Sequence, residues 1–129
     1  MNIPADLKYS KSDEWVKVEG ATATTGVTDY AQGQLSDIVY VELPAPGATI
    51  KQGKPWGSVE SVKAAADVNL PLSGTVTAVN EALKDKPETV NSDPYGAGWM
   101  VKFTITNASE LSGLMDAAAY TKYCEERKS

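Results

Sequence analysis

One lysine stands between two runs of mainly apolar residues in the middle of the chain. The segment reads GSVESVKAAADVNLPLSG, from Gly57 to Gly74, and its lysine is Lys63. A primary amine at an exposed turn is a target for covalent acylation, and the three alanines that follow leave room for a modifying enzyme. Glu60, three residues before the lysine, and Asp67, four residues after it, are candidate recognition contacts.

Two simpler interpretations of Lys63 stay open at this point. Its side chain could be an ordinary solvated lysine in a turn. Alternatively, the segment VKAAAD could form one helical turn, because alanine favours helix. Pro71 and the short length of the segment weaken this helical alternative.

Residue types that are missing exclude several kinds of catalytic site. The chain contains no histidine and a single cysteine, Cys124. Nucleophile systems that need histidine, and histidine-based metal sites, are therefore excluded. One cysteine also excludes an intramolecular disulfide, which suits a reducing compartment. Paired carboxylates could still hydrolyse a substrate, but the acidic residues are scattered, so we expect a protein that is not an enzyme.

Length and charge indicate one acidic domain, residues 1–129, that docks onto other proteins. The net charge of −5 and the pI of about 4.7 argue against a nucleic-acid partner, which needs a basic surface. No apolar run approaches the length of a membrane span. The N-terminus, MNIPADLKYSKSDEW, has no targeting pattern. We therefore expect a bacterial cytoplasmic protein, with the mitochondrial matrix as the alternative for a processed form.

Apolar residues alternate mostly with a period of two, which predicts a mainly β protein. Thr28 is predicted to cap a short helix that reaches Leu35, with Asp29 in its first turn. Ser109 and Asp116 are predicted caps of one or two C-terminal helices within residues 107–127. Strands are expected at 15–18, 21–27, 38–43, 56–61, 67–72, 74–79 and 99–105.

These segments predict a sandwich of two small antiparallel sheets, with the core spanning about residues 15–106. Lys63 would lie at a hairpin tip between two similar halves. Alternation in the last strand, WMVKFTI, would direct four side chains to one face, namely Trp99, Val101, Phe103 and Ile105. The residues expected to be mostly buried are Trp56, Val59, Val76, Val101 and Phe103.

Several segments resemble motifs of the glycine cleavage H protein family. ESVKAAADV, with PLSG after it, resembles the motif around the family's modified lysine, and GVTDYAQGQLSDIVYVELPAPG resembles the segment before it. VNEALKDKPETVNSDPYGAGWM and LMDAAAYTKY resemble later segments, so the resemblance runs from Leu7 to Tyr123. Biotin carriers place methionines beside their lysine, and lipoyl domains of 2-oxo-acid dehydrogenases typically place an acid before it. This chain instead has Val62 and Ala64.

The resemblance implies a fold, a cofactor and partners. It implies a lipoyl-domain-like barrel-sandwich hybrid that carries lipoate in amide linkage on Lys63. The chain would be a non-catalytic carrier, monomeric when free, modified by lipoate-attaching enzymes. It would shuttle the aminomethyl group of glycine between a pyridoxal-phosphate glycine decarboxylase, a folate-dependent aminomethyltransferase and dihydrolipoyl dehydrogenase. A lipoyl or octanoyl relay protein in lipoate assembly, and an unmodified β-sandwich adaptor, are the alternatives.

The chemistry of such a loaded arm predicts a pocket. The amine of a bound aminomethyl group is largely protonated near neutral pH, and in water the group can be lost as formaldehyde. Hydroxyl and carboxylate acceptors would hold the cation, and the candidates are Ser12, Glu14 and Asp67. Ser12 and Glu14 flank Asp13 in an extended segment, so their side chains can share one face. The alternative interpretation is that Ser12, Glu14 and Asp67 are ordinary polar surface residues. Between Ser12 and Glu14, Asp13 stands where the family usually has histidine.

Overall fold

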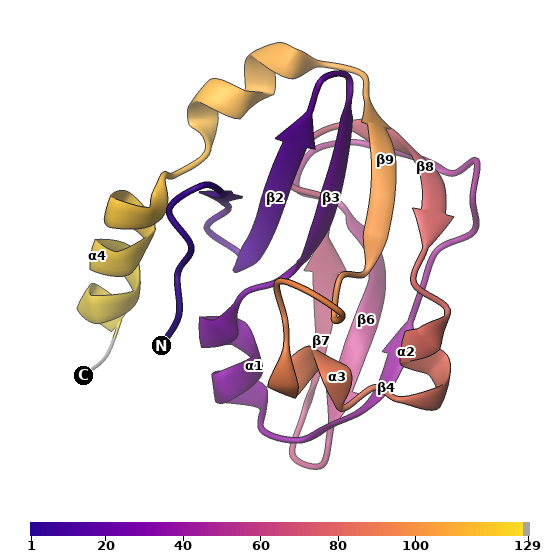
Figure 1. Ribbon diagram of the computed structural model, residues 1–129, viewed down its shortest axis with the longest axis vertical. Coiled ribbons are helices and arrows are strands. Elements are labelled where there is room, and N and C mark those ends of the chain that lie inside the picture. Colours follow the sequence, from indigo (N-terminus) through magenta and orange to yellow (C-terminus); the bar gives the residue numbers. More distant parts are fainter. Residues whose placement is uncertain (128–129) are drawn as a thin grey trace.

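The computed structural model describes residues 1–127. The chain forms two antiparallel β-sheets, with three short helices at one end and a C-terminal helix along one side (Figure 1). The strands are β1 (Lys8–Tyr9), β2 (Glu14–Glu19), β3 (Thr22–Val27), β4 (Ile38–Glu42), β5 (Thr49–Ile50), β6 (Pro55–Ser61), β7 (Ala65–Asn69), β8 (Gly74–Val79) and β9 (Val101–Ile105). The helices are α1 (Asp29–Leu35), α2 (Ala82–Asp85), α3 (Thr89–Ser92), the 3₁₀ helix η1 (Ala108–Gly113) and α4 (Ala117–Arg127).

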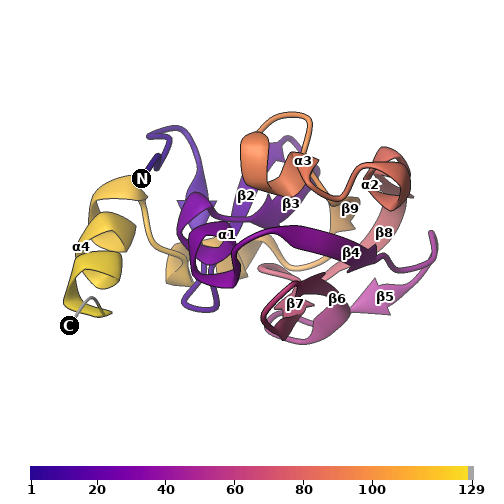
Figure 2. The ribbon, with the colours of Figure 1, turned by 90° about the horizontal axis from the view of Figure 1, so that it is seen from below.

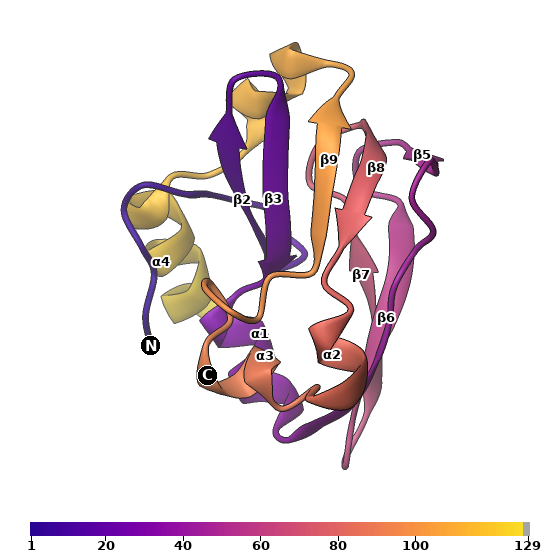
Figure 3. The same ribbon diagram turned by 45° about the vertical axis from the view of Figure 1, so that its right-hand side comes forward.

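The two sheets form the layers of the expected sandwich. The larger sheet has six strands in the order β1-β2-β3-β9-β8-β5, and the smaller has three in the order β4-β6-β7. Figure 3 shows β2, β3, β9 and β8 in front of β6 and β7, and Figure 2 shows the layers from the hairpin end. The chain leaves the large sheet after β3, builds the small sheet around the β6–β7 hairpin, and returns at β8.

The main core lies between the layers, because alternate residues of both sheets point inward. All five residues expected in the core are buried, including Trp56 at 7% exposure and Phe103 at 0%. The core continues under the short helices through Leu83 of α2 and Val90 of α3. The prediction of two antiparallel sheets around these residues is confirmed.

A second apolar cluster attaches α4 and the N-terminal segment to the outside of the large sheet. The rings of Tyr9 and Tyr120 stack with centroids 4.7 Å apart, and Trp15 lies in the same cluster. Cys124, on α4, is fully buried there. This cluster could not be predicted from local patterns, because its members come from segments far apart in the chain.

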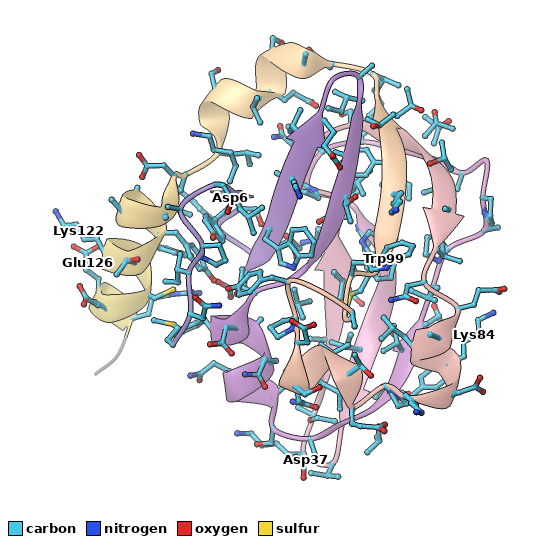
Figure 4. All side chains as sticks on the ribbon, viewed as in Figure 1. Asp6, Asp37, Lys84, Trp99, Lys122 and Glu126 are labelled. Carbon is cyan, nitrogen blue, oxygen red and sulfur yellow. The ribbon has the colours of Figure 1, made fainter. Side chains whose placement is uncertain are left out.

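The last strand is shorter than expected, and Trp99 does not share its inward face. β9 begins at Val101, since the preceding residues form a turn in which the Trp99 N–H donates to the Gly96 carbonyl at 3.1 Å. Trp99 packs partly buried against the second cluster, whereas Val101 belongs to the main core. The Lys102 ammonium lies 4.9 Å from the centre of the Trp99 ring, which is labelled in Figure 4.

Other boundaries also differ from expectation. β7 begins at Ala65 and ends at Asn69, before Pro71, which lacks the N–H that a strand would use. The predicted cap Ser109 is wrong, because Asn107 caps η1 and Ser109 supplies the N–H donor. The caps at Thr28 and Asp116 are confirmed: Thr28 accepts from the Ala31 N–H, and Asp116 accepts from the Ala119 N–H.

The described helices are short. Within residues 1–127, α4 is the longest at 11 residues, and no helix combines the length and apolar character that a membrane span requires.

Candidate functional site

Lys63 lies at the tip of the hairpin that joins β6 to β7. The Ser61 N–H donates to the Ala64 carbonyl at 2.7 Å, which makes Val62 and Lys63 the two residues of a tight turn. The Ser61 hydroxyl oxygen also accepts from the N–H groups of Lys63 at 3.2 Å and Ala64 at 3.0 Å. The helical alternative for VKAAAD is therefore wrong, and the Lys63 side chain is exposed.

The tip is also tied to the neighbouring strand. The Val62 N–H donates to the Asp37 carbonyl at 3.1 Å, just before β4 begins. Asp37 is labelled at the same lower end of the molecule in Figure 4, where the hairpin projects beyond the short helices. Val62 is 70% exposed, so the lysine and its neighbour protrude together from a backbone that is hydrogen-bonded on both sides.

A cavity of about 190 Å³ lies alongside this hairpin, and it brings together all three predicted acceptors. Ser12 reaches it from the turn before β2, Glu14 from the first position of β2, and Asp67 from β7. Two further polar residues, Asp13 and Gln34, also line it. The remaining wall is apolar and is contributed by α1, β3, β6 and β7: Val27, Ala31, Leu35, Val59, Ala66 and Val68. Glu60 does not line this cavity; it is exposed on β6, opposite Ala65 in the strand register.

Glu14 is the buried acid of this cavity, with 1% of its surface exposed. Its Oε1 accepts hydrogen bonds from the hydroxyls of Ser10 at 2.6 Å and Ser12 at 2.5 Å, and its Oε2 accepts from the Asn69 N–H at 3.2 Å. Burial raises the pKa of Glu14 to about 7, because desolvation penalises the charged form more than these three donors favour it.

Asp67 has a different environment. It lies on β7 opposite Ser58 and is exposed, so its carboxylate remains hydrated at the mouth of the cavity. The cavity thus combines one buried acid with a pKa near neutrality, the partly buried Asp13, one exposed acid and a hydroxyl. Such a set suits a ligand with an apolar stem and a cationic end.

Glu14 also borders a second, larger cavity of about 380 Å³, which shares Ser12 with the first. Its other lining residues come from the N-terminal segment, the loop after β5, the end of β7 with the residues after it, and the segment before α4, and include Tyr9, Gln52, Asn69, Pro71 and Met115. Ser10 and Asn69 were missed by the sequence reasoning. The extended segment expected at Ser12–Glu14 is wrong, because residues 11–13 form a turn in which Asp13 has a φ of +74°, so strand alternation does not explain why Ser10 and Ser12 meet Glu14. The Asn69 contact is made by a backbone N–H, which any residue except proline could supply.

Among residues 1–127, histidine, cysteine and the acidic residues form no group of three or more that could hold a metal ion.

Comparison with known proteins gives a consistent result. A model of the family described as "Glycine cleavage H-protein" matches residues 7–127. The mitochondrial glycine cleavage system H protein 2 of Arabidopsis thaliana is 54% identical over 121 residues, which cover 94% of this chain and 78% of that protein. The glycine cleavage system H protein of Myxococcus xanthus is 52% identical over 120 residues, which cover 93% of each chain.

A solved structure agrees with these matches. The crystal structure of a glycine cleavage system H protein from Mycobacterium marinum matches with a TM-score of 0.85 and 36% identity, covering 93% of this chain and 97% of that one. The family match includes both sheets, the Lys63 hairpin and α4. This chain therefore belongs to the glycine cleavage H-protein family.

Proposed function

We propose that this chain is the lipoyl carrier of a glycine cleavage system and that Lys63 is its attachment site. The observation that carries the proposal is the exposure of Lys63 at the tip of a hydrogen-bonded hairpin, in a member of this family. The lipoyl group, once attached, supplies the sulfur chemistry by which an aminomethyl group is accepted and handed on.

The cavity beside the hairpin fits such an arm. Ala66 and Asp67 line it three and four residues after Lys63, and a strand rises about 3.3 Å per residue, so its mouth lies within about 13 Å of the lysine Cα. An arm of about a dozen bonds reaches on the order of 15 Å. Its hydrocarbon stem matches the apolar wall formed by residues such as Val59 and Leu35.

When the arm rests in this cavity, the protein's own contribution is to hold the cationic end of the arm and to exclude water. The Glu14 carboxyl group is partly protonated at neutral pH, and a cation beside it favours the charged form, so the carboxyl proton is released as the cation enters. Ser12 and Ser10 keep Oε1 hydrogen-bonded in either state. Asp67 adds a second negative charge at the mouth.

The partners proposed for this carrier are the glycine decarboxylase, the aminomethyltransferase, dihydrolipoyl dehydrogenase and the lipoate-attaching enzymes. Glu60, exposed beside the tip, is proposed as a contact for the attaching enzymes. The net charge of −5 would steer partners that carry complementary patches. We propose that the chain itself is one non-catalytic domain, monomeric when free. Of the two compartments expected, the Arabidopsis relative is named mitochondrial and the Myxococcus relative is bacterial.

Peptide mass spectrometry tests the attachment site. Protein from a lipoate-replete host should carry the lipoyl mass increment on Lys63 and on no other lysine. Lys63→Arg should fold normally, because the turn is held by Ser61 and backbone groups, yet support no glycine decarboxylation in a reconstituted system. Modification at Lys51 or Lys54 in place of Lys63 would overturn the assignment.

A further inference from the structure

The C-terminal turn of α4 contacts the turn that carries Ser12 and Glu14. Arg127 donates to both carboxylate oxygens of Asp13, at 2.6 Å to Oδ1 and 3.2 Å to Oδ2. The Tyr120 hydroxyl donates to the same Oδ1 at 2.8 Å. The side chains of Arg127 and Asp13 are 28% and 17% exposed, so this pair is partly withdrawn from water. A two-pronged contact of this kind fixes orientation as well as distance.

Aromatic rings hold Arg127 in place for this contact. Its guanidinium carbon lies 4.2 Å from the centre of the Tyr30 ring and 4.1 Å from that of Tyr123. Tyr30 belongs to α1, which also lines the cavity of about 190 Å³ proposed to hold the lipoyl arm, here called the arm cavity. The Tyr123 hydroxyl donates to the Lys11 carbonyl at 2.9 Å. The two rings thus help to fix the orientation of the guanidinium that contacts Asp13. Through Lys11 and Asp13, α4 contacts the turn on both sides of Ser12.

Asp13 needs such support because of its backbone conformation. Its φ is +74°, in the left-handed region that residues other than glycine seldom adopt. This reversal lets the Glu14 N–H donate to the Ser10 hydroxyl oxygen at 3.0 Å, and it turns the hydroxyls of Ser10 and Ser12 toward the Glu14 carboxylate. The Asp13 carbonyl in turn accepts from the N–H of Thr28, the cap of α1.

We infer that Asp13 and Arg127 are positioning residues for the arm cavity: they form a latch through which the end of α4 holds the Ser10–Glu14 turn in the form that buries and hydrogen-bonds Glu14. The inference rests on the proposed function only in taking this cavity as the resting place of the arm. The latch itself consists of contacts within the unmodified chain.

Charge alone makes a different prediction from positioning. The Asp13 carboxylate acts on Glu14 through space and contributes to its raised pKa, although burial is the largest cause. Other charged or titratable side chains face Glu14 across the cavities: Asp67 in the smaller one, and Lys11 and Tyr9 in the larger one. If Arg127 and Asp13 acted only as charges, removing one would raise the Glu14 pKa and removing the other would lower it.

Carbon-detected NMR titration of Glu14 in the unlipoylated protein separates these possibilities. The variants are Arg127→Gln and Asp13→Asn, whose charge changes are opposite. If the latch positions the turn, both variants admit water to Glu14 and both lower its pKa from about 7 toward the ordinary 4.5. Arg127→Lys, which keeps the charge but not the two-pronged geometry, should recover only part of the wild-type value.

Lys122→Gln is the matched control for Arg127→Gln, since it removes the same charge from the same helix. Lys122 is exposed and points away from the sheets (Figure 4). In Lys122→Gln the pKa of Glu14 should equal that of wild type. Amide hydrogen exchange adds a second readout: protection of the Asp13 and Glu14 N–H groups should fall roughly two- to fivefold in Arg127→Gln, the size expected for a partly exposed ion pair.

Opposite shifts of the Glu14 pKa in the two variants, or no shift in either, would overturn the latch. Loss of α4 from the circular dichroism of Arg127→Gln would not affect this decision, because Asp13→Asn and Arg127→Lys test the same contact from the other side and with less disruption. A separate measurement tests the proposed function: lipoylated Arg127→Gln loaded with the aminomethyl group should release formaldehyde faster than the lipoylated and loaded Lys122→Gln. If both variants shift the Glu14 pKa in the same direction but release is no faster, the latch stands and the lipoyl arm does not rest in this cavity.

Discussion

Glu14 should make the stability of this protein depend on pH across the neutral range. In the folded chain its pKa is about 7, and in the unfolded chain the carboxyl group is hydrated and titrates near 4.5. A raised pKa means that the folded state binds the proton more tightly than the unfolded state does. The contribution of Glu14 to folding is therefore most favourable below pH 4.5, and it is lost as pH rises through about 7.

The size of this effect follows from the interval between the two pKa values. At about 1.4 kcal/mol per pKa unit, an interval from 4.5 to about 7 corresponds to about 3 kcal/mol. That is a large fraction of the 5–15 kcal/mol typical of a folded domain. The conversion is appropriate because Glu14 is 1% exposed, so water does not screen it.

Denaturant unfolding of unlipoylated wild type and Glu14→Gln, at steps from pH 5 to pH 8, measures this effect. Over this window wild type should lose about 2.5 kcal/mol relative to the variant as pH rises, whatever constant offset the amide introduces. The chain has no histidine, so few other groups titrate in this window. Glu60→Gln, which removes an exposed carboxylate, is the control and should follow wild type. A wild-type curve parallel to that of Glu14→Gln at every pH would refute the buried-acid argument.

Three further outcomes are expected. Phe103→Ala should lower the free energy of unfolding by about 3–5 kcal/mol in denaturant titration, because the ring is fully buried between the sheets; a midpoint equal to that of wild type would remove it from the core. Gly57→Ala should destabilise the small sheet, since the new Cβ would overlap the backbone carbonyl of Glu42; unchanged thermal unfolding would contradict this. In loaded, lipoylated protein, Glu14→Gln and Asp67→Asn should each release formaldehyde faster than wild type, whereas equal rates would return both acids to the surface or to docking.

The strands and the main core could be predicted because alternation is a local signal. Val59, Val76 and Phe103 alternate with polar or small residues in their segments, and each is buried as expected. Trp99 shows where this reasoning fails. Alternation alone extends the strand back to Trp99, but the N–H of Trp99 closes the turn that begins at Gly96, and β9 begins only at Val101.

The residue types of the candidate site could be predicted, but the long-range contacts that surround Glu14 and Asp13 could not. Ser12, Glu14 and Asp67 were expected from the chemistry of a cationic group, and one cavity brings them together. The environment of Glu14 could not be foreseen, because one of its hydrogen-bond donors is the backbone N–H of Asn69, which is 55 residues away. The latch of Arg127 onto Asp13 spans 114 residues, and no local pattern reports a contact at that separation.

The burial of Cys124 has a consequence for redox specificity. Its sulfur lies inside the aromatic cluster under α4, with the Arg127 guanidinium 3.7 Å away. Thiol–disulfide exchange requires a thiolate that can approach a disulfide sulfur in line. A carrier that presents a cyclic disulfide on its own surface would otherwise be exposed to attack by its own thiol, or by that of a second copy. Because Cys124 is covered, such a mixed disulfide can form only if α4 first opens, and under the proposed function this cover would keep a dithiolane on Lys63 from reacting with the chain's own thiol.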